Sequence, residues 1–195
     1  MNFKPTNYFD LTNFTQADIF EGVENIWEVL KKLSSYLNGI VIDPTAKVDP
    51  TAKILGPAII GANTVIGFNA LIRENVITGS DCIIGHGTEV KNSIILNNSF
   101  FSHMSYIGDS VIGNNINFGG GAKTGNLRLD KAPVTVKIGE EIIETGLEKF
   151  GAVVGDNTKI GINAVLNPGT ILGKNCIVYP LVSVNGVFAE NSKIK

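Results

Sequence analysis

Two histidines are the side chains in this sequence best suited to proton transfer near neutral pH. His86 and His103 are the only histidines among the 195 residues, and an imidazole with its ordinary pKa of about 6.5 is mostly neutral there and can accept a proton. His86 follows Ile84 and Gly85 in an unbroken stretch of the six-residue repeat described below, which predicts a solvated, outward side chain. His103 lies where that repeat slips, so we expect it in a cleft between coils and treat it as the candidate functional histidine.

Other familiar kinds of catalytic or metal site are not indicated. Cys82 and Cys176 form no C-x-x-C pair, and two histidines seventeen residues apart are too few for a three-histidine zinc site. We therefore expect no metal, the alternative being a site completed by a second subunit. The segment GGGAKT at 119–124 does not fit a P-loop, because Ala122 stands where the glycine before the lysine is required. No Ser/His/Asp nucleophile arrangement can be argued.

Composition narrows the class of protein. The 18 acidic and 16 basic residues give a net charge of −2, which argues against nucleic acid as a partner because phosphate binding needs a clustered basic excess. Hydrophobic residues make up 44%, enough for a core, yet no apolar run approaches the roughly 18 residues of a membrane span. The first residues lack the features of a secretion signal. We expect a cytoplasmic protein that binds neither nucleic acid nor membranes.

Glycine is enriched because a six-residue pattern runs through most of the chain. There are 22 glycines, many of which follow an aliphatic residue that leads each hexad. The leads recur over residues 48–96, resume at Tyr106 after a slip near His103, and return over 154–178, and both cysteines stand at the small inward position of their hexads. This period is typical of a parallel β-helix, in which the leads fill a narrow prism. We predict an all-β, left-handed parallel β-helix with three hexads to a coil.

The segment before the repeats is predicted to be helical. Thr15 and Asp18 resemble a capping box, and Gly39 lies just past the end. We expect one amphipathic helix over residues 15–37 that packs against the first coils or a neighbouring subunit. Its apolar face would consist of Ile19, Val23, Ile26, Trp27, Leu30, Leu33 and Leu37.

A second segment interrupts the repeats. Residues 126–149 lose the six-residue rhythm and contain a predicted β-hairpin between Val134 and Ile143. Long loops on a rigid scaffold usually carry function. The predicted organisation is a helical extension (1–44) followed by a β-helix domain (45–195) with 126–149 as an inserted loop.

Three strings around His103 resemble a known enzyme family. They are Glu89-Val-Lys-Asn-Ser, Ser102-His-Met-Ser-Tyr-Ile-Gly-Asp-Ser and Ile112-Gly-Asn-Asn-Ile-Asn-Phe-Gly-Gly-Gly. Residues 45–185 resemble the C-terminal acetyltransferase domain of the bifunctional glucosamine-1-phosphate acetyltransferase/N-acetylglucosamine-1-phosphate uridylyltransferase family. The strings Asn126-Leu-Arg-Leu-Asp and Lys149-Phe-Gly are similar to its archaeal-type, long-loop branch.

The chain also departs from this family. Gly120 replaces an alanine and Leu127 a tyrosine, and the C-terminal tail is short. The uridylyltransferase domain that precedes the repeats in the family is missing from the sequence. We therefore expect no pyrophosphorylase activity.

The resemblance implies direct N-acetyl transfer from acetyl-CoA, as co-substrate, to an amino-sugar phosphate, with no acyl-enzyme. His103 would be the general base that takes a proton from the attacking amine. The implied acetyl-CoA contacts are Gly120 and Ile162. The implied contacts to the sugar and its phosphate are Arg73, Lys91, Tyr106, Asn117, Asn126 and Lys149, with Lys131 as the alternative to Lys149.

The resemblance further implies a homotrimer with each site between adjacent prisms. A separate nucleotidyltransferase is a possible partner. The acceptor alternative is a nucleotide-linked amino sugar. A hypothesis of a different class is a non-catalytic β-helix that serves as an oligomerisation or interaction module.

Overall fold

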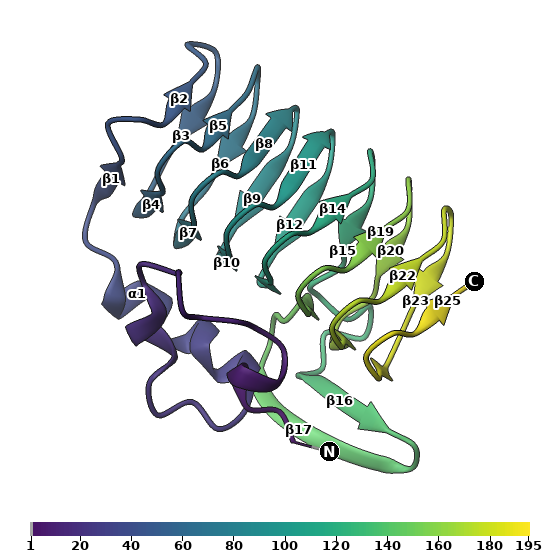
Figure 1. Ribbon diagram of the computed structural model, residues 1–195. Helices are drawn as coiled ribbons and strands as arrows, with labels where there is room; N and C mark the ends of the chain where they lie inside the picture. Colours follow the sequence, from purple (N-terminus) through teal and green to yellow (C-terminus); the bar gives the residue numbers. More distant parts are fainter. Residues whose placement is uncertain (1) are drawn as a thin grey trace.

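The chain folds into a parallel β-helix, as the sequence predicted, and the computed structural model describes residues 2–195 (Figure 1). Strands of successive coils pair in parallel and form the three walls of a prism. Sheet A contains β1 (Ile40–Ile42), β4 (Ala58–Ile60), β7 (Val76–Thr78), β10 (Ser93–Ile95), β13 (Val111–Ile112), β18 (Ala152–Val154), β21 (Thr170–Leu172) and β24 (Val187–Phe188). Sheet B contains β2 (Lys47–Val48), β5 (Val65–Ile66), β8 (Ile83–His86), β11 (Phe100–His103), β14 (Asn117–Phe118), β19 (Lys159–Ile160), β22 (Ile177–Val178) and β25 (Lys193–Ile194). Sheet C contains β3 (Lys53–Ile54), β6 (Leu71–Ile72), β9 (Glu89–Lys91), β12 (Tyr106–Gly108), β15 (Lys123–Thr124), β20 (Val165–Leu166) and β23 (Ser183–Val184).

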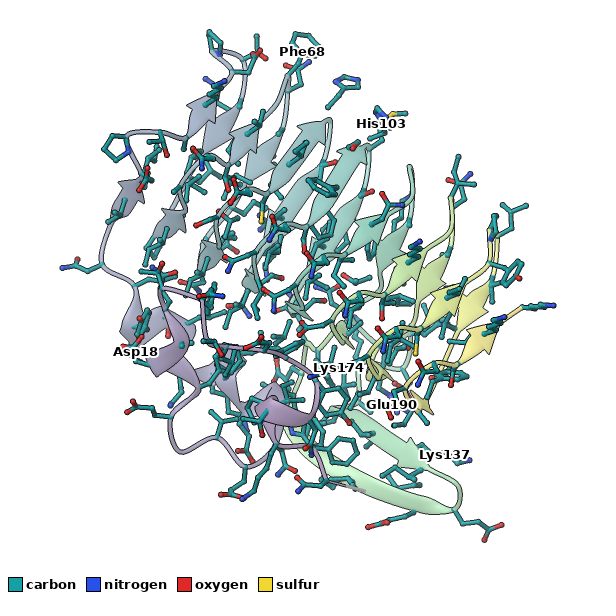
Figure 2. The ribbon with its side chains drawn as sticks, in the orientation of Figure 1. Asp18, Phe68, His103, Lys137, Lys174 and Glu190 are labelled. Carbon is teal, nitrogen blue, oxygen red and sulfur yellow. The ribbon has the colours of Figure 1, made fainter. Side chains whose placement is uncertain are left out.

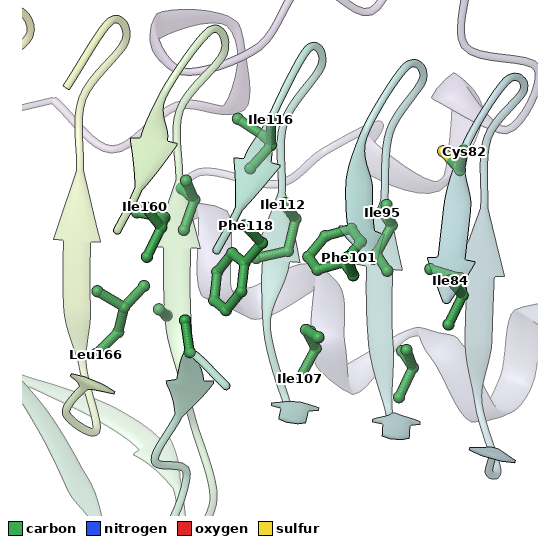
Figure 3. Close-up of a cluster of buried hydrophobic side chains, with 14 of the residues drawn as sticks. Cys82, Ile84, Ile95, Phe101, Ile107, Ile112, Ile116, Phe118, Ile160 and Leu166 are labelled. Carbon is green, nitrogen blue, oxygen red and sulfur yellow. The ribbon is translucent and has the colours of Figure 1, made fainter. Parts of the chain in front are cut away.

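The inside of the prism is filled by the aliphatic residues that lead the hexads. On sheet B, Ile84 and Phe101 are register partners, and so are Phe118 and Ile160 on the following coils; all four are buried (Figure 3). Cys82 also lies in this core, as does Cys176 further along the prism, which confirms the inward positions predicted for both cysteines.

The six-residue pattern changes phase at other residues than the sequence predicted. The side chains that point into the prism are those of Ile95 and Ile107, whereas the prediction placed Leu96 and Tyr106 there. Each slip follows from a corner that turns one residue early, at Asn92 and again at Asp109, both of which have a left-handed φ (44° and 49°). The repeat is therefore shortened on either side of His103, and His103 itself is the last residue of a strand that keeps the regular register.

The N-terminal segment is less regular than the single helix predicted over 15–37. It forms four short helices: η1 (Pro5–Asn7), η2 (Ala17–Phe20), η3 (Ile26–Lys31) and α1 (Leu33–Tyr36). Gly22 has a φ of 71° and Asn25 is extended, so the helix cannot continue between η2 and η3. The capping box is made by Asn25 and Glu28, in place of the predicted Thr15 and Asp18.

All seven residues predicted for the apolar face are nevertheless buried. They pack on the outer face of sheet A along the middle coils, a broader contact than the predicted packing on the first coils, and share one cluster with Ile77, Ile94, Val111, Val153 and Ile171. Figure 1 shows this segment lying along the prism beside β17. Sheet A is therefore covered by residues of its own chain.

The inserted segment contains the predicted hairpin, formed by the antiparallel strands β16 (Val134–Ile138) and β17 (Glu141–Leu147). The Lys31 ammonium donates a hydrogen bond of 3.1 Å to the Thr145 carbonyl oxygen, which ties the hairpin to the N-terminal segment. At the start of the prism, β1 already pairs with β4, so the β-helix begins before residue 45. Within residues 2–195, none of the helices has the length and apolar character that a membrane crossing requires.

Candidate active site

His103 ends β11 at the corner where sheet B meets sheet C, with its side chain exposed (Figure 2). Its register partner on the preceding coil is His86. The two histidines therefore occupy equivalent positions, and the prediction that they differ in local phase is wrong. They differ in their surroundings: the His86 ring stacks on Phe68 with centroids 5.3 Å apart, and its Nδ1 lies 3.2 Å from the Phe68 carbonyl oxygen. We find no hydrogen-bond partner for the His103 ring within residues 2–195.

Gly120 and Ile162 follow His103 on the next two coils. The amide of Gly121 donates to the His103 carbonyl oxygen (2.9 Å), and the amide of Asn163 donates to that of Gly120 (3.0 Å). A Cβ added to Gly120 would lie 3.4 Å from the His103 Cβ, so glycine leaves space beside the imidazole. Ile162 is 54% exposed. The structure thus aligns the candidate base with both residues that the resemblance assigns to acetyl-CoA.

The two neighbouring glycines here allow a matched test of packing. A Cβ on Gly119 would meet backbone atoms, at 2.5 Å from the Ile162 nitrogen and 2.6 Å from the Gly161 carbonyl carbon. We expect Gly119→Ala to lower the free energy of unfolding by about 1–3 kcal/mol, the usual range for overpacking. The free energy of unfolding of Gly120→Ala is expected to stay near that of wild type. Urea denaturation measures the free energy of unfolding of both variants. Equal destabilisation would contradict the open space beside Gly120.

A second cluster lies at the other end of sheet C, at its corner with sheet A. It contains four of the predicted acceptor contacts: Arg73, Lys91, Tyr106 and Asn126. Three carboxylates that the sequence analysis did not single out accompany them. Arg73 pairs with Glu74 (3.3 Å) and Glu89 (3.1 Å), and Lys91 pairs with Glu74 (3.9 Å) and Asp109 (3.5 Å).

Asp109 is the buried centre of this cluster, with 3% of its surface exposed. Besides Lys91, its carboxylate accepts hydrogen bonds from the side-chain amides of Asn92 (2.8 Å) and Asn126. It lies at the second shortened corner, one coil after Lys91. The spacing of 16 to 18 residues between the cations and Glu89 or Asp109 equals one coil, and this spacing is the signal that could have revealed the carboxylates from sequence.

Tyr106 joins the two ends of the site. It begins the strand that leads from the His103 corner to Asp109, and its hydroxyl oxygen accepts a hydrogen bond from Asn126 (3.2 Å). Burial raises the pKa of the Tyr106 phenol, with further contributions from the negative charges of Asp109 and Glu89. The phenol therefore stays protonated and can donate its own hydrogen to a ligand.

The guanidinium of Arg73 is held in its charged form. The hydrogen bond to Glu89 raises the pKa of Arg73, which keeps the guanidinium charged.

The remaining predicted contacts are Lys149, its alternative Lys131, and Asn117. Lys149 precedes Phe150, whose amide donates to the Asn126 carbonyl oxygen (2.9 Å), so the backbone brings Lys149 beside Asn126. Lys131 lies further along the loop, where its amide donates a hydrogen bond to the Arg128 carbonyl oxygen (3.1 Å). Asn117 is exposed on β14 of sheet B, whereas Tyr106 is on sheet C. One prism therefore presents the predicted contacts on two faces.

No group of three or more His, Cys, Asp or Glu side chains suited to a metal ion occurs in the part of the chain that the structure describes.

Comparisons with known proteins agree with the repeat and with the resemblance. A family model described as the GMPPB C-terminal domain matches residues 55–146, and the bacterial transferase hexapeptide model (six repeats) matches residues 151–186. The "Bifunctional protein GlmU" of Methanococcus vannielii is 46% identical over 93 residues, which are 48% of this chain and 22% of that protein. The "Bifunctional sugar-1-phosphate nucleotidylyltransferase/acetyltransferase" of Sulfurisphaera tokodaii is 41% identical over 97 residues, 50% of this chain and 24% of that protein.

Among solved structures, the acetyltransferase domain of PglB from Neisseria gonorrhoeae, in complex with acetyl coenzyme A, aligns with a TM-score of 0.34 and 13% identity, covering 85% of this chain and 60% of that one. The sequence matches confirm the family resemblance of the repeat region. The matched region is less than a quarter of the length of either sequence relative.

Proposed function

We propose that this hexapeptide-repeat chain, a relative of the bifunctional GlmU proteins over its repeat region, transfers the acetyl group of acetyl-CoA to the amine of an amino-sugar phosphate. His103 accepts a proton from the amine as the nitrogen attacks the thioester carbonyl carbon. The carbon–sulfur bond then breaks, and the CoA thiolate takes the proton from the imidazolium. The products are an N-acetyl amide and the CoA thiol, and the histidine returns to its neutral form.

The alignment of His103, Gly120 and Ile162 is the observation that carries this proposal. A thioester placed over the space beside Gly120 has the exposed imidazole as its neighbour. Direct transfer is supported because neither cysteine can act as an acyl carrier there. Both lie inside the prism, and burial raises the pKa of the Cys82 thiol to about 12, which leaves it without the thiolate that a nucleophile requires.

The acceptor lies along sheet C in this proposal. Tyr106 begins β12 three residues after His103, and Arg73 and Lys91 lie at the far end of that face. An amino sugar with its amine at His103 would place its phosphate by these cations and by Lys149. The phosphate would have to replace Glu74 and Glu89 as partner of Arg73, while buried Asp109 continues to hold Lys91 and Asn126.

The proposed assembly is a homotrimer with each site between two protomers. Asn117 and Tyr106 are on different walls of one prism, so a single concave site can contain both only if sheet B of one protomer faces sheet C of its partner. Sheet A is covered by residues 3–37 and the hairpin, and sheets B and C remain for this contact.

A complementation experiment tests the shared site. We expect Asn117→Ala and Lys91→Ala to be weakly active alone, because each removes an acceptor contact from every site. Unfolding and reassembling them together is expected to restore activity, since some interfaces then combine the intact sheet B of one protomer with the intact sheet C of the next. Light scattering should show a trimer. A monomer, or no recovery in the mixture, would contradict the shared site.

Release of thiol from acetyl-CoA, measured against a panel of amino sugars and their phosphates, tests the activity itself. The competing candidate is a non-catalytic interaction module, favoured by the fact that Arg73 and Lys91 are both already paired with carboxylates. No release with any acceptor from a folded, assembled protein would favour the module.

A further inference from the structure

A groove of about 600 Å³ lies beside Asn126, outside the roles assigned above. It runs between the inserted loop, the first strand of the hairpin and the corner that follows β20 and β23. Gly125 and Leu127, the neighbours of Asn126 in sequence, line its near end. Its side chains include Leu127, Arg128, Leu129, Lys137, Asn167 and Asn185.

The groove continues the row of corner positions to which Lys91 belongs. Lys91 pairs in register with Gly108. Further along the same corner, the amide of Gly125 donates to the Leu166 carbonyl oxygen, and the amide of Asn167 donates to that of Val184. From Lys91 to Asn185 the corner spans four coil steps of about 4.8 Å each, or about 19 Å. The polar cluster and the groove together are thus longer than a monosaccharide phosphate requires.

The chemistry of the groove suits an anion joined to an apolar ring. Arg128 and Lys137 supply two positive charges and Asp130 one negative charge, which leaves the groove with a net charge of +1. Lys137 forms no salt bridge with another side chain of residues 2–195. Arg128 is held by two hydrogen bonds to Asp130 (2.9 and 2.6 Å), which fixes its planar guanidinium. The half-exposed side chain of Leu127 and the fully exposed side chain of Leu129 provide apolar surface beside these cations.

We infer that this groove binds the nucleoside diphosphate part of a nucleotide-linked amino sugar, which would then be the acceptor. The diphosphate would lie between Lys91 and the cations of the groove, the base would pack on Leu127 and Leu129, and the amine would extend along Tyr106 to His103. The inference rests on the proposed function, and it specifies the acceptor class that the polar cluster alone leaves open.

Binding of uridine diphosphate (UDP), measured by calorimetry on the full chain, tests the groove without the reaction. We expect UDP to bind more tightly than inorganic pyrophosphate, which lacks the base. Arg128→Ala and Lys137→Ala should each weaken UDP binding by about 10-fold or more, the usual effect of losing one charge-assisted contact. The matched control is Lys47→Ala, since Lys47 is an exposed lysine on β2, in the first coil at the opposite end of the prism from the groove (Figure 1).

Kinetics separate this inference from the proposed function. In acetyl transfer, both groove variants should lower kcat/KM for UDP-glucosamine and leave kcat/KM for glucosamine 1-phosphate unchanged. Absence of UDP binding, or equal binding by wild type and both variants, would overturn the inference even if glucosamine 1-phosphate is acetylated. UDP binding that depends on Arg128 and Lys137, in a protein that acetylates neither acceptor, would support the groove and refute the transferase.

Discussion

Replacing His103 by alanine is expected to lower kcat by about 10²–10⁴-fold, the range for losing a general base, with little change in thermal stability. The catalytic effect follows from the exposed imidazole beside the space at Gly120. The small effect on stability follows because the ring fills none of the core and forms no hydrogen bond in the part of the chain that the structure describes. Steady-state release of CoA thiol and a thermal melt measure the two quantities.

His86→Ala is the matched control, and the structure makes it a stricter one than the sequence did. The two histidines are register partners at the same corner, so they share backbone geometry and differ in their neighbours. His86 stacks on Phe68 and contacts its carbonyl group, and we expect its loss to leave kcat nearly unchanged. Wild-type activity in folded His103→Ala, or an equal loss in both variants, would remove His103 from the role of base.

The largest effect on stability is expected from Trp27→Ala, which should lower the free energy of unfolding by about 3–5 kcal/mol. Trp27 is 1% exposed, and its ring centroid lies 5.0 Å from that of Phe3 and 6.1 Å from that of Phe150. A cavity at this point would loosen the N-terminal segment from sheet A. Because the amide of Phe150 holds the Asn126 carbonyl oxygen, activity should decline at lower urea concentrations than in wild type.

Tyr179→Ala serves as the control for Trp27→Ala. Tyr179 is an aromatic residue on the exterior of the last coils, where its ring lies under the Lys195 ammonium at 5.1 Å. An exposed substitution of this kind is usually worth about 0.5 kcal/mol or less. If urea denaturation gave similar values for the two variants, the N-terminal segment would not be an integral part of the folded core.

The sequence was sufficient to predict the prism but not its phase. Hexads identify a β-helix because an inward aliphatic residue is required at each wall, whatever lies outside. The string Ile94-Ile95-Leu96 is aliphatic throughout, so a shift of one residue leaves no trace in the pattern, and the shortened corners were missed. A phase slip at His103 is one argument that the sequence offers for its role, but the slips lie at Asn92 and Asp109. The resemblance of the surrounding string to a family motif is therefore the stronger argument.

The candidate site could be predicted only in part for a related physical reason. A motif aligns residues along the chain, whereas the carboxylates around Arg73 and Lys91 come from neighbouring coils.

The N-terminal segment shows the same limit: helical spacing correctly predicted which residues are buried, because burial selects apolar positions. It could not predict the breaks at Gly22 and Asn25, because these depend on the path of the chain across sheet A.

The position of the N-terminal segment has a consequence for folding during synthesis. Most coils pair with their predecessor after 16 to 18 residues, and the coil that follows the inserted loop does so after 42, so the prism can grow as the chain leaves the ribosome. The first segment waits much longer for its partners: Lys31 bonds to Thr145, and the amide of Asp10 bonds to the carboxylate of Asp156, separations of 114 and 146 residues. At about 5–20 residues per second, those partners appear roughly 6–30 s later. We therefore expect the N-terminal segment to be among the last parts of the chain to dock, with the apolar face of sheet A exposed until it does.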